Sequence, residues 1–396
     1  MWGYIMGKRR LDLQFKCWII LLSSCLIMPT HVVVHKQVIV PKKQTVKKTV
    51  VKPKTIIRPV YANITAVGDT ICHDRINAQA YSSINRQYHY SSLFTNIKSH
   101  FQGKDLCIAN LETTINPRLP VHGYPNFNAP ASLIDDLKAL GIHMVSTANN
   151  HCLDTGYDGL VSTIDTLNEK KMDHTGTYKS AYDRDTILMK NLNGIQTAFL
   201  SFTYGTNHAL AKSQSYSVNV INKDEMKRQI DLAKKAGAQA IVVSMHWGVE
   251  YQLKENQTQD DLAQFLIQNG VNVILGSHPH VLQPMKRLTV KDAQGQSHEG
   301  FVIYSLGNFF SSQVAPHTHE SVILDIRLKK EKQVTVDQVH YTPLYNAQNG
   351  RSYTLYDLDQ VISSYEKGNP QRYSAAFYNQ AKKEKAQIAS IMGGDL

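Results

Sequence analysis

The segment VNVILGSHPH, residues 271–280, joins a short apolar run to a polar cluster that contains two histidines. Similar runs of mostly aliphatic residues occur five more times, and each is followed by polar side chains. Such runs predict short buried strands. The other five runs are residues 64–67, 106–109, 142–146, 240–244 and 301–304, and they lead to Asp69, Asn110, Asn149, His246 and Asn308 respectively.

Helical stretches lie between several of these strands. Residues 133–140, 224–236 and 259–268 are predicted helices. The second begins with a capping pattern from Asn222 to Glu225. The third begins with a pattern formed by Thr258 and Asp261. Strands that alternate with helices predict an α/β fold with a buried, mainly parallel sheet. In such folds ligands bind at the carboxyl ends of the strands, so the six polar strand ends predict one site.

The strand ends supply oxygen and imidazole ligands suited to Zn²⁺, Mn²⁺ or iron, and no thiolate. A single histidine at a strand end is more often structural, whereas three histidines with two acids favour a metal centre. Pro279 would fix the backbone between the last two of these histidines. The candidate ligands are Asp69, Glu112, Asn150, His246, His278 and His280.

The formal net charge of +11 is concentrated at the N-terminus. Residues 1–60 hold twelve of the 43 Lys and Arg residues and one of the 32 Asp and Glu residues. The rest of the chain holds 31 of each and is formally neutral, which argues against a nucleic-acid-binding domain. Hydrophobic residues at 42% and charged residues at 19% exclude collagen-like, mostly disordered and many-span membrane chains.

Residues 1–35 have the order of an export signal, with Lys8, Arg9 and Arg10 before an apolar run at 17–28. Three interpretations remain: an uncleaved signal-anchor, which the length and flanks favour, a lipoprotein signal with Cys25 as the lipidated residue, and a cleaved signal. All three place the bulk of the chain outside the cytoplasm, and the favoured one places it at the extracytoplasmic face of the cell membrane.

Residues 36–60 form a basic linker rich in Lys, Pro and Val, without Gly or acidic residues. Charge repulsion and proline predict an extended spacer that lifts a domain off a membrane. The alternative is a polycation that holds an anionic surface polymer.

Three cysteines lie outside the signal segment: Cys72, Cys107 and Cys152. They are predicted to be small buried residues, with a thiolate ligand or a redox pair as the alternative.

The C-terminal third continues the fold. Residues 321–345 predict a hairpin that turns at 330–332 and completes the second sheet, and residues 374–391 predict a helix. The predicted domains are therefore a core at 61–350 and a helical extension at 351–396.

The strand ends carry the strings AVGDTICHDR (66–75), IANLETT (108–114), TANNHCLDTGYDGL (147–160), SMHWGVEY (244–251), LGSHPHVLQP (275–284) and IYSLGNFFSS (303–312). In this order they resemble the CapA family of bacterial poly-γ-glutamate capsule-biosynthesis proteins, over residues 62–312. That family is similar to calcineurin-like metallophosphoesterases. The resemblance implies a metallophosphatase-like four-layer α/β/β/α sandwich with two central mixed sheets and two divalent metal ions, Mn, Zn or Fe.

The resemblance also implies roles for single residues. Asp69 and His280 would bind the first metal, Glu112 would stand at the bridging position, and Asn150, His246 and His278 would bind the second. His151 would protonate the leaving group, while Asn149 and Asp154 orient its loop. The chain departs from the phosphoesterase pattern in two places: His73 is the first histidine after Asp69, where Asp-x-His is usual, and Asn110-x-Glu112 replaces Gly-Asp-x-x-Asp.

Two classes of function follow from these observations. One is a metal-dependent hydrolase or transferase that acts on an anionic surface polymer. The other is a non-catalytic component that binds, exports or organises such a polymer with membrane synthase or export proteins. No nucleic-acid partner is expected. The candidate substrate-binding residues are Asn110, Trp247, Glu250, Tyr251 and Asn308.

Overall fold

The computed structural model describes residues 58–369 and 371–396. The predicted signal segment and nearly all of the linker lie outside the described residues. Within the described part of the chain, no helix is both long enough and apolar enough to cross a membrane.

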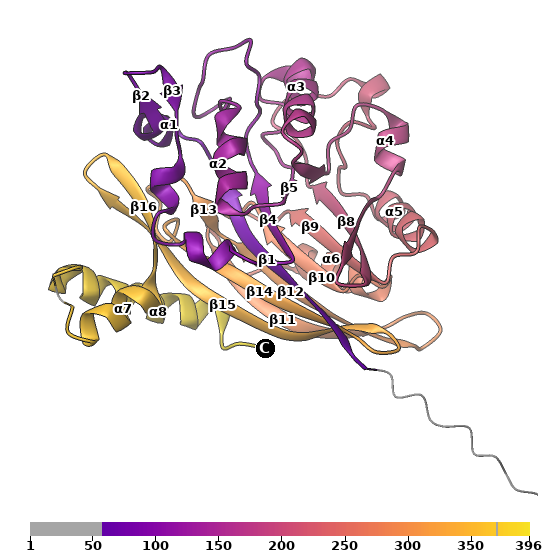
Figure 1. The fold of residues 1–396 in the computed structure, drawn as a ribbon. Coiled ribbons are helices and arrows are strands. Elements are labelled where there is room, and N and C mark those ends of the chain that lie inside the picture. The colour runs from indigo at the N-terminus through magenta and orange to yellow at the C-terminus, as the bar shows by residue number, and fades with distance from the viewer. Residues whose placement is uncertain (1–57, 370) are drawn as a thin grey trace, which may run out of the picture. The chain divides into compact units, whose positions relative to one another are not determined.

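Two mixed sheets form the centre of the fold (Figure 1). In the first sheet β1, β4, β5 and β6 are parallel, and a hairpin-connected group of strands continues it on the other side of β1. Its strands, in order, are β16 (Ser352–Asp357), β15 (Val334–Asn349), β14 (Glu320–Lys330), β1 (Val60–Thr70), β4 (Leu106–Leu111), β5 (Met144–Ser146) and β6 (Asp173–Thr175), and β13 (Asn308–Phe310) also pairs with β1.

The second sheet has four parallel strands with an antiparallel strand at each edge. Its order is β11 (Leu282–Lys291), β12 (Ser297–Leu306), β10 (Val273–Ser277), β9 (Ala240–His246), β8 (Ile195–Thr203) and β7 (Leu188–Leu192). A separate small pair consists of β2 (Tyr81–Ser82) and β3 (Gln87–Tyr88). The predicted α/β class with two mixed sheets is confirmed.

Helices cover the outer faces of the two sheets. The core between the sheets contains Ile64 of β1 and Val242 of β9. On its other side, the first sheet packs on Leu137 of α2, and the second packs on Ile230 of α5 and Leu266 of α6. The helices are α1 (Asp74–Ala80), α2 (Ser132–Leu140), α3 (Gly156–Glu169), α4 (Ala181–Asp185), α5 (Lys223–Lys235), α6 (Gln257–Gln268), α7 (Leu358–Glu366) and α8 (Ala375–Met392), with short 3-10 turns at η1 (Ser91–Phe94), η2 (Lys98–Phe101) and η3 (Lys212–Gln214).

The helix caps explain two of the boundaries. The Asn222 side chain accepts a hydrogen bond from the backbone N–H of Glu225, as the sequence predicts. Helix α6 begins two residues earlier than expected because Asn256 and Gln259 form a reciprocal capping box. Thr258 therefore lies inside the helix instead of preceding it.

The C-terminal region requires two corrections. The hairpin β14–β15 belongs to the first sheet, because β14 pairs with β1 along seven residues from Val60 to Ala66. The predicted extension at 351–396 begins with strand β16, which pairs with β15, so a boundary at 350 would divide a hairpin. Helix α8 buries Ile388 and Met392 in the core between the sheets, and this region is therefore part of the same domain.

Candidate metal centre

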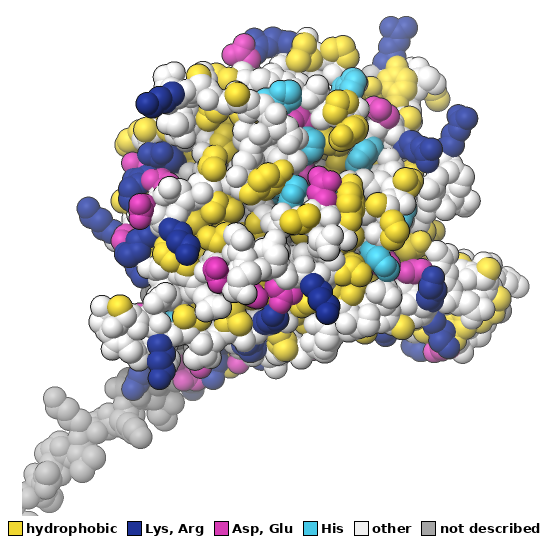
Figure 2. Space-filling model, turned by 180° about the vertical axis from the view of Figure 1, so that it is seen from behind, with side chains coloured by type: hydrophobic (Ala, Val, Ile, Leu, Met, Phe, Trp, Pro, Cys, Tyr) yellow, Lys and Arg dark blue, Asp and Glu magenta, His cyan; other side chains and the backbone are white. Residues whose placement is uncertain are grey.

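The carboxyl ends of the parallel strands bring the predicted ligands together. Asp69 lies opposite Asn110 where β1 and β4 end, and His246 lies opposite Ser277 where β9 and β10 end. Asp69, Glu112 and His246 are almost completely buried. Figure 2 shows histidine side chains gathered around acidic ones on one face of the molecule.

The ligand atoms fall into two overlapping groups. One contains Glu112, His278 and His280, and the other contains Asp69, Glu112 and His246, with the atoms of each group within 4.8 Å of one another. His280 Nδ1 lies 3.3 Å from Asp69 Oδ2. His246 Nε2 lies 2.8 Å from Asn150 Oδ1 and 3.7 Å from Glu112 Oε1. Glu112 is common to both groups, as expected of a residue at a bridging position.

The electrostatics of this cluster suit a cation. Burial and the nearby Asp69 carboxylate raise the pKa of Glu112 well above its usual range. Burial and the neighbouring histidines lower the pKa of His246 well below its usual range and that of His278 to about 3. Neutral imidazole is the form that binds metal. Among the described residues, no Lys or Arg forms an ion pair with Asp69 or Glu112.

Two buried polar atoms in the cluster have no hydrogen-bond partner in the described protein, Glu112 Oε1 and His278 Nδ1. A buried polar atom without a partner is unfavourable, and a divalent ion bound to both groups would satisfy these two atoms. The residues present therefore fit a metal ion. The cluster is mixed oxygen and nitrogen, which accommodates Zn²⁺, Mn²⁺ or iron.

Asn110 bridges the two carboxylates through its side-chain amide. Its Nδ2 donates to Asp69 Oδ1 at 2.8 Å and to Glu112 Oε2 at 3.2 Å. The amide thus occupies one oxygen of each acid and leaves the other oxygens directed to the histidines. Asn110 was predicted to bind substrate, but it is 5% exposed and its amide is bound to both candidate ligand carboxylates, so we assign it a positioning role.

The loop after β5 carries a hydrogen-bonded His–Asp pair. His151 Nδ1 lies 2.7 Å from Asp154 Oδ2, and the same carboxylate oxygen accepts the backbone N–H of Phe127. Asn149 is buried and ties this loop to β4 through a 2.7 Å bond to the carbonyl of Leu111. With Nδ1 engaged by Asp154, Nε2 is the ring nitrogen left for a ligand.

Three residues at the site have left-handed backbone conformations that non-glycine residues rarely adopt: Tyr251 (φ 64°), His278 (φ 95°) and His280 (φ 59°). Such strain is characteristic of functional sites. In the turn at 278–280 both imidazoles reach the same carboxylate, since ligand atoms of His278, His280 and Glu112 lie within 4.8 Å of one another. The strained turn therefore serves the ligand geometry.

The predicted substrate residues occupy different environments. Glu250 and Tyr251 lie at the rim, and the Tyr251 ring is 6.2 Å from that of His280. Trp247 is corrected to a core residue: it is 2% exposed, and its indole N–H donates to the carbonyl of Tyr304. Asn308 is also corrected, because it is fully buried and its Oδ1 lies 3.2 Å from His280 Nδ1, so it supports that histidine.

Two more residues at this rim belong to the segment 204–207, for which the sequence predicts a turn but no chemical role. The Tyr204 ring lies 4.6 Å from that of His278 and is 48% exposed. Asn207 Nδ2 lies 3.3 Å from His151 Nδ1, and its backbone N–H donates to the carbonyl of Asn150. Both follow strand β8, in a polar turn after an apolar and aromatic run, and the structure places this turn beside the candidate ligands.

His73 lies near the cluster without joining either group of ligand atoms in the described chain. Burial and the positive charge that His280 and His151 can carry lower its pKa to about 4. Its Nδ1 accepts the backbone N–H of Ser312, and its ring packs edge-on against Phe127. The usual Asp-x-His ligand is therefore not replaced by His73 in this geometry.

The three cysteines are free and buried, as predicted. Burial raises the pKa of Cys72, Cys107 and Cys152 to about 12. At about pH 8 roughly one such thiol in ten thousand is ionised, and the thiolate is the reactive form.

We expect no reaction with Ellman's reagent over an hour in the folded Cys17→Ser, Cys25→Ser variant. After unfolding in guanidinium, three equivalents of thiol per chain should react. Rapid native labelling of any of the three would contradict the buried placement.

The fold and the site define an α/β protein with a candidate metal centre at the carboxyl ends of its strands. The model of the bacterial capsule synthesis protein family, PGA_cap, matches residues 63–313. The chain belongs to this family.

Two curated relatives carry capsule-related names. The chain is 32% identical over 219 residues to the capsule biosynthesis protein CapA of Bacillus anthracis, covering 54% of this chain and 51% of that protein. It is 30% identical over 248 residues to the PGA biosynthesis protein CapA of Bacillus subtilis, covering 60% of this chain and 62% of that protein. The chain thus spans about half to three fifths of the length of these relatives.

Solved structures with a detectable likeness include a 5'-nucleotidase precursor from Thermus thermophilus, at 14% identity and a TM-score of 0.42, covering 83% of this chain and 58% of that one. Another is the calcineurin-like phosphoesterase YfkN from Bacillus subtilis, at 16% identity and a TM-score of 0.42, covering 78% of this chain and 98% of that one.

Proposed function

We propose that this protein is a membrane-attached, extracytoplasmic enzyme of capsule or surface-polymer biosynthesis, with a metallophosphatase-like core and a metal-dependent hydrolase or transferase site. The observation that carries the proposal is the buried cluster in which Glu112 is shared by two groups of ligand atoms. Family membership and the names of the curated relatives support a poly-γ-glutamate-like polymer as the substrate, and the basic and apolar N-terminal sequence supports the membrane attachment.

Metal ions held here would supply Lewis acidity, which activates water and polarises a scissile phosphoester or amide. Asp69 and Glu112 would bind them through the oxygens that Asn110 leaves free. His151 would move a proton through Nε2 while Asp154 holds the opposite ring nitrogen. Tyr204 and Tyr251 would line the approach to the cluster and exclude water from part of it.

The alternative is a non-catalytic component that binds or exports the polymer together with membrane synthase proteins. A His151→Ala variant separates the two. If the site is catalytic, turnover of bis-p-nitrophenyl phosphate or of poly-γ-glutamate should fall by roughly 10²–10⁴-fold, the usual contribution of a general acid or base. Metal content should stay at the wild-type level, because His151 is outside both groups of ligand atoms.

His89→Ala is the matched control, since His89 is an exposed histidine remote in sequence from every strand end of the site. It should leave turnover unchanged. A metal-loaded wild-type protein that turns over neither compound would contradict the enzymatic proposal and favour the polymer-organising role.

A further inference from the structure

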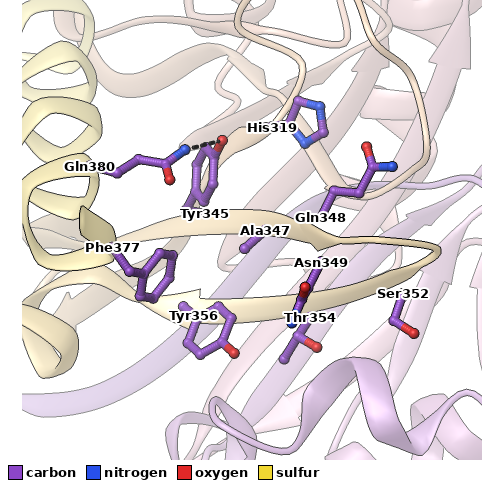
Figure 3. Close-up of a pocket in the computed structure, with 10 residues that line it drawn as sticks. All are labelled: His319, Tyr345, Ala347, Gln348, Asn349, Ser352, Thr354, Tyr356, Phe377 and Gln380. Atoms are coloured by element: carbon purple, nitrogen blue, oxygen red, sulfur yellow. Dashed lines mark hydrogen bonds between the residues drawn. The ribbon is translucent and has the colours of Figure 1, made fainter. Parts of the chain in front are cut away.

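A hollow lies on the β15–β16 hairpin at the edge of the first sheet, and none of the candidate metal ligands lines it (Figure 3). It has a volume of about 490 Å³, within the range of small-molecule sites. The hairpin β15–β16 forms its floor, helix α8 contributes Phe377 and Gln380, and His319 contributes from the residue before β14.

The strand register explains the shape of the floor. Three directly opposed pairs line it: Tyr345 with Tyr356, Ala347 with Thr354, and Asn349 with Ser352. Alternate residues of a strand share one face, so these six side chains lie on the same side of the hairpin. The opposite face buries Leu344, Tyr353 and Leu355 in the core. The hollow exists because the middle pair, Ala347 with Thr354, has small side chains. It has aromatic rings at one end and polar groups at the other.

The lining combines aromatic surface with uncharged polar groups. Tyr345, Tyr356 and Phe377 are partly exposed, and the rings of Tyr356 and Phe377 are 4.9 Å apart. Gln380 donates to the Tyr345 hydroxyl at 2.8 Å and fixes that ring. Within the described chain, the side chains of Asn349, Ser352 and Thr354 make no hydrogen bond to protein groups and are free to bind a ligand.

The charges near the hollow argue against an anionic ligand. None of the ten lining residues is Lys, Arg, Asp or Glu. The carboxyl groups of Glu384 and Glu320 lie near Tyr345, at the edge of the hollow. A polyglutamate chain would find no Lys or Arg to pair with in the lining, and a cation would find no carboxylate there.

We propose that this hollow binds a neutral saccharide. A sugar ring has an apolar C–H face that packs on aromatic rings and a rim of hydroxyls that both donate and accept hydrogen bonds. The tyrosine and phenylalanine rings would pack against the C–H face of the sugar. Its hydroxyls would bind the side chains of asparagine, serine, threonine and glutamine. This site uses none of the candidate metal ligands and does not depend on the proposed function of the metal centre.

The test is isothermal titration of the full-length chain with chitotetraose, cellotetraose and maltotetraose, in buffer free of sugar-based detergents. At least one of them should bind, with a Kd in roughly the millimolar range or tighter. Ala347→Trp fills the middle of the floor and should weaken binding by about tenfold or more. Asn349→Ala, which removes a polar group from an exposed position and leaves the packing intact, should weaken it by about threefold or more.

Ala376→Trp is the matched control, because Ala376 is an exposed residue of α8 outside the lining. The affinity of the Ala376→Trp variant for the tetrasaccharide should stay within about twofold of that of the wild type. The proposal is overturned if none of the three tetrasaccharides binds, or if both tryptophan variants and Asn349→Ala bind as the wild type does. Binding of a poly-γ-glutamate decamer in their place, lost in Ala347→Trp, would also overturn it.

Discussion

A Glu112→Gln variant should lose most of its bound metal. Glu112 is common to both groups of ligand atoms, and its Oε1 has no protein partner in the described chain. The amide removes the negative charge that attracts the ions and offers one weak oxygen instead. We expect about two equivalents of metal in the wild type and fewer than about half an equivalent in the variant. Inductively coupled plasma mass spectrometry of the full-length chain, loaded with Mn²⁺, Zn²⁺ or Fe²⁺, measures both.

Glu250→Gln provides the control for this change. Glu250 is an exposed carboxylate whose charge reaches Glu112, but it lies outside both groups of ligand atoms. This variant should retain the wild-type metal content. Wild-type metal content in both variants would show that Glu112 is not a ligand. Metal at the background level in the wild-type protein would show that the metal centre does not exist.

The strand ends could be predicted because their pattern is local. A β-branched run followed by Asp69, by His246 or by His278 is visible in a few residues of sequence. Within each sheet, parallel strands bring such ends to one edge whatever the order of the strands. Asp69 ends a strand of the first sheet and His246 ends a strand of the second, and the packing of the two sheets brings these edges together. The candidate ligands could therefore be chosen from the sequence alone, and the structure brings their ligand atoms into two groups.

Properties that depend on distant partners could not be predicted in the same way. The pattern of β14 fits either sheet, and only its pairing with β1 assigns it to the first. Trp247 directly follows the candidate ligand His246, yet its side chain lies in the core and packs against Tyr304. Asn308 was predicted to bind substrate, but it is buried, pairs with the end of β1, and its Oδ1 lies beside His280 Nδ1.

Gly68→Ala should destabilise the fold strongly. A Cβ at this position would lie 1.8 Å from the carbonyl oxygen of Gly307 and 2.9 Å from its carbonyl carbon. Both are backbone atoms, so no side-chain rotation can relieve the overlap. The same carbonyl accepts the N–H of Asp69 at 3.0 Å, and the two segments pair where β1 meets β13. We expect the free energy of unfolding to fall by about 3 kcal/mol or more.

Gly205→Ala separates this clash from a general effect of losing glycine. A Cβ at Gly205 meets nothing within 4 Å, so its free energy of unfolding should change by no more than about 0.5 kcal/mol. Urea unfolding of both variants after chelation, followed by circular dichroism, excludes any contribution from bound metal. Equal midpoints would mean that β1 and the 307–308 turn can separate without cost. In that case the close approach of these two backbone segments would not be what fixes the position of the candidate ligand Asp69 beside Asn308.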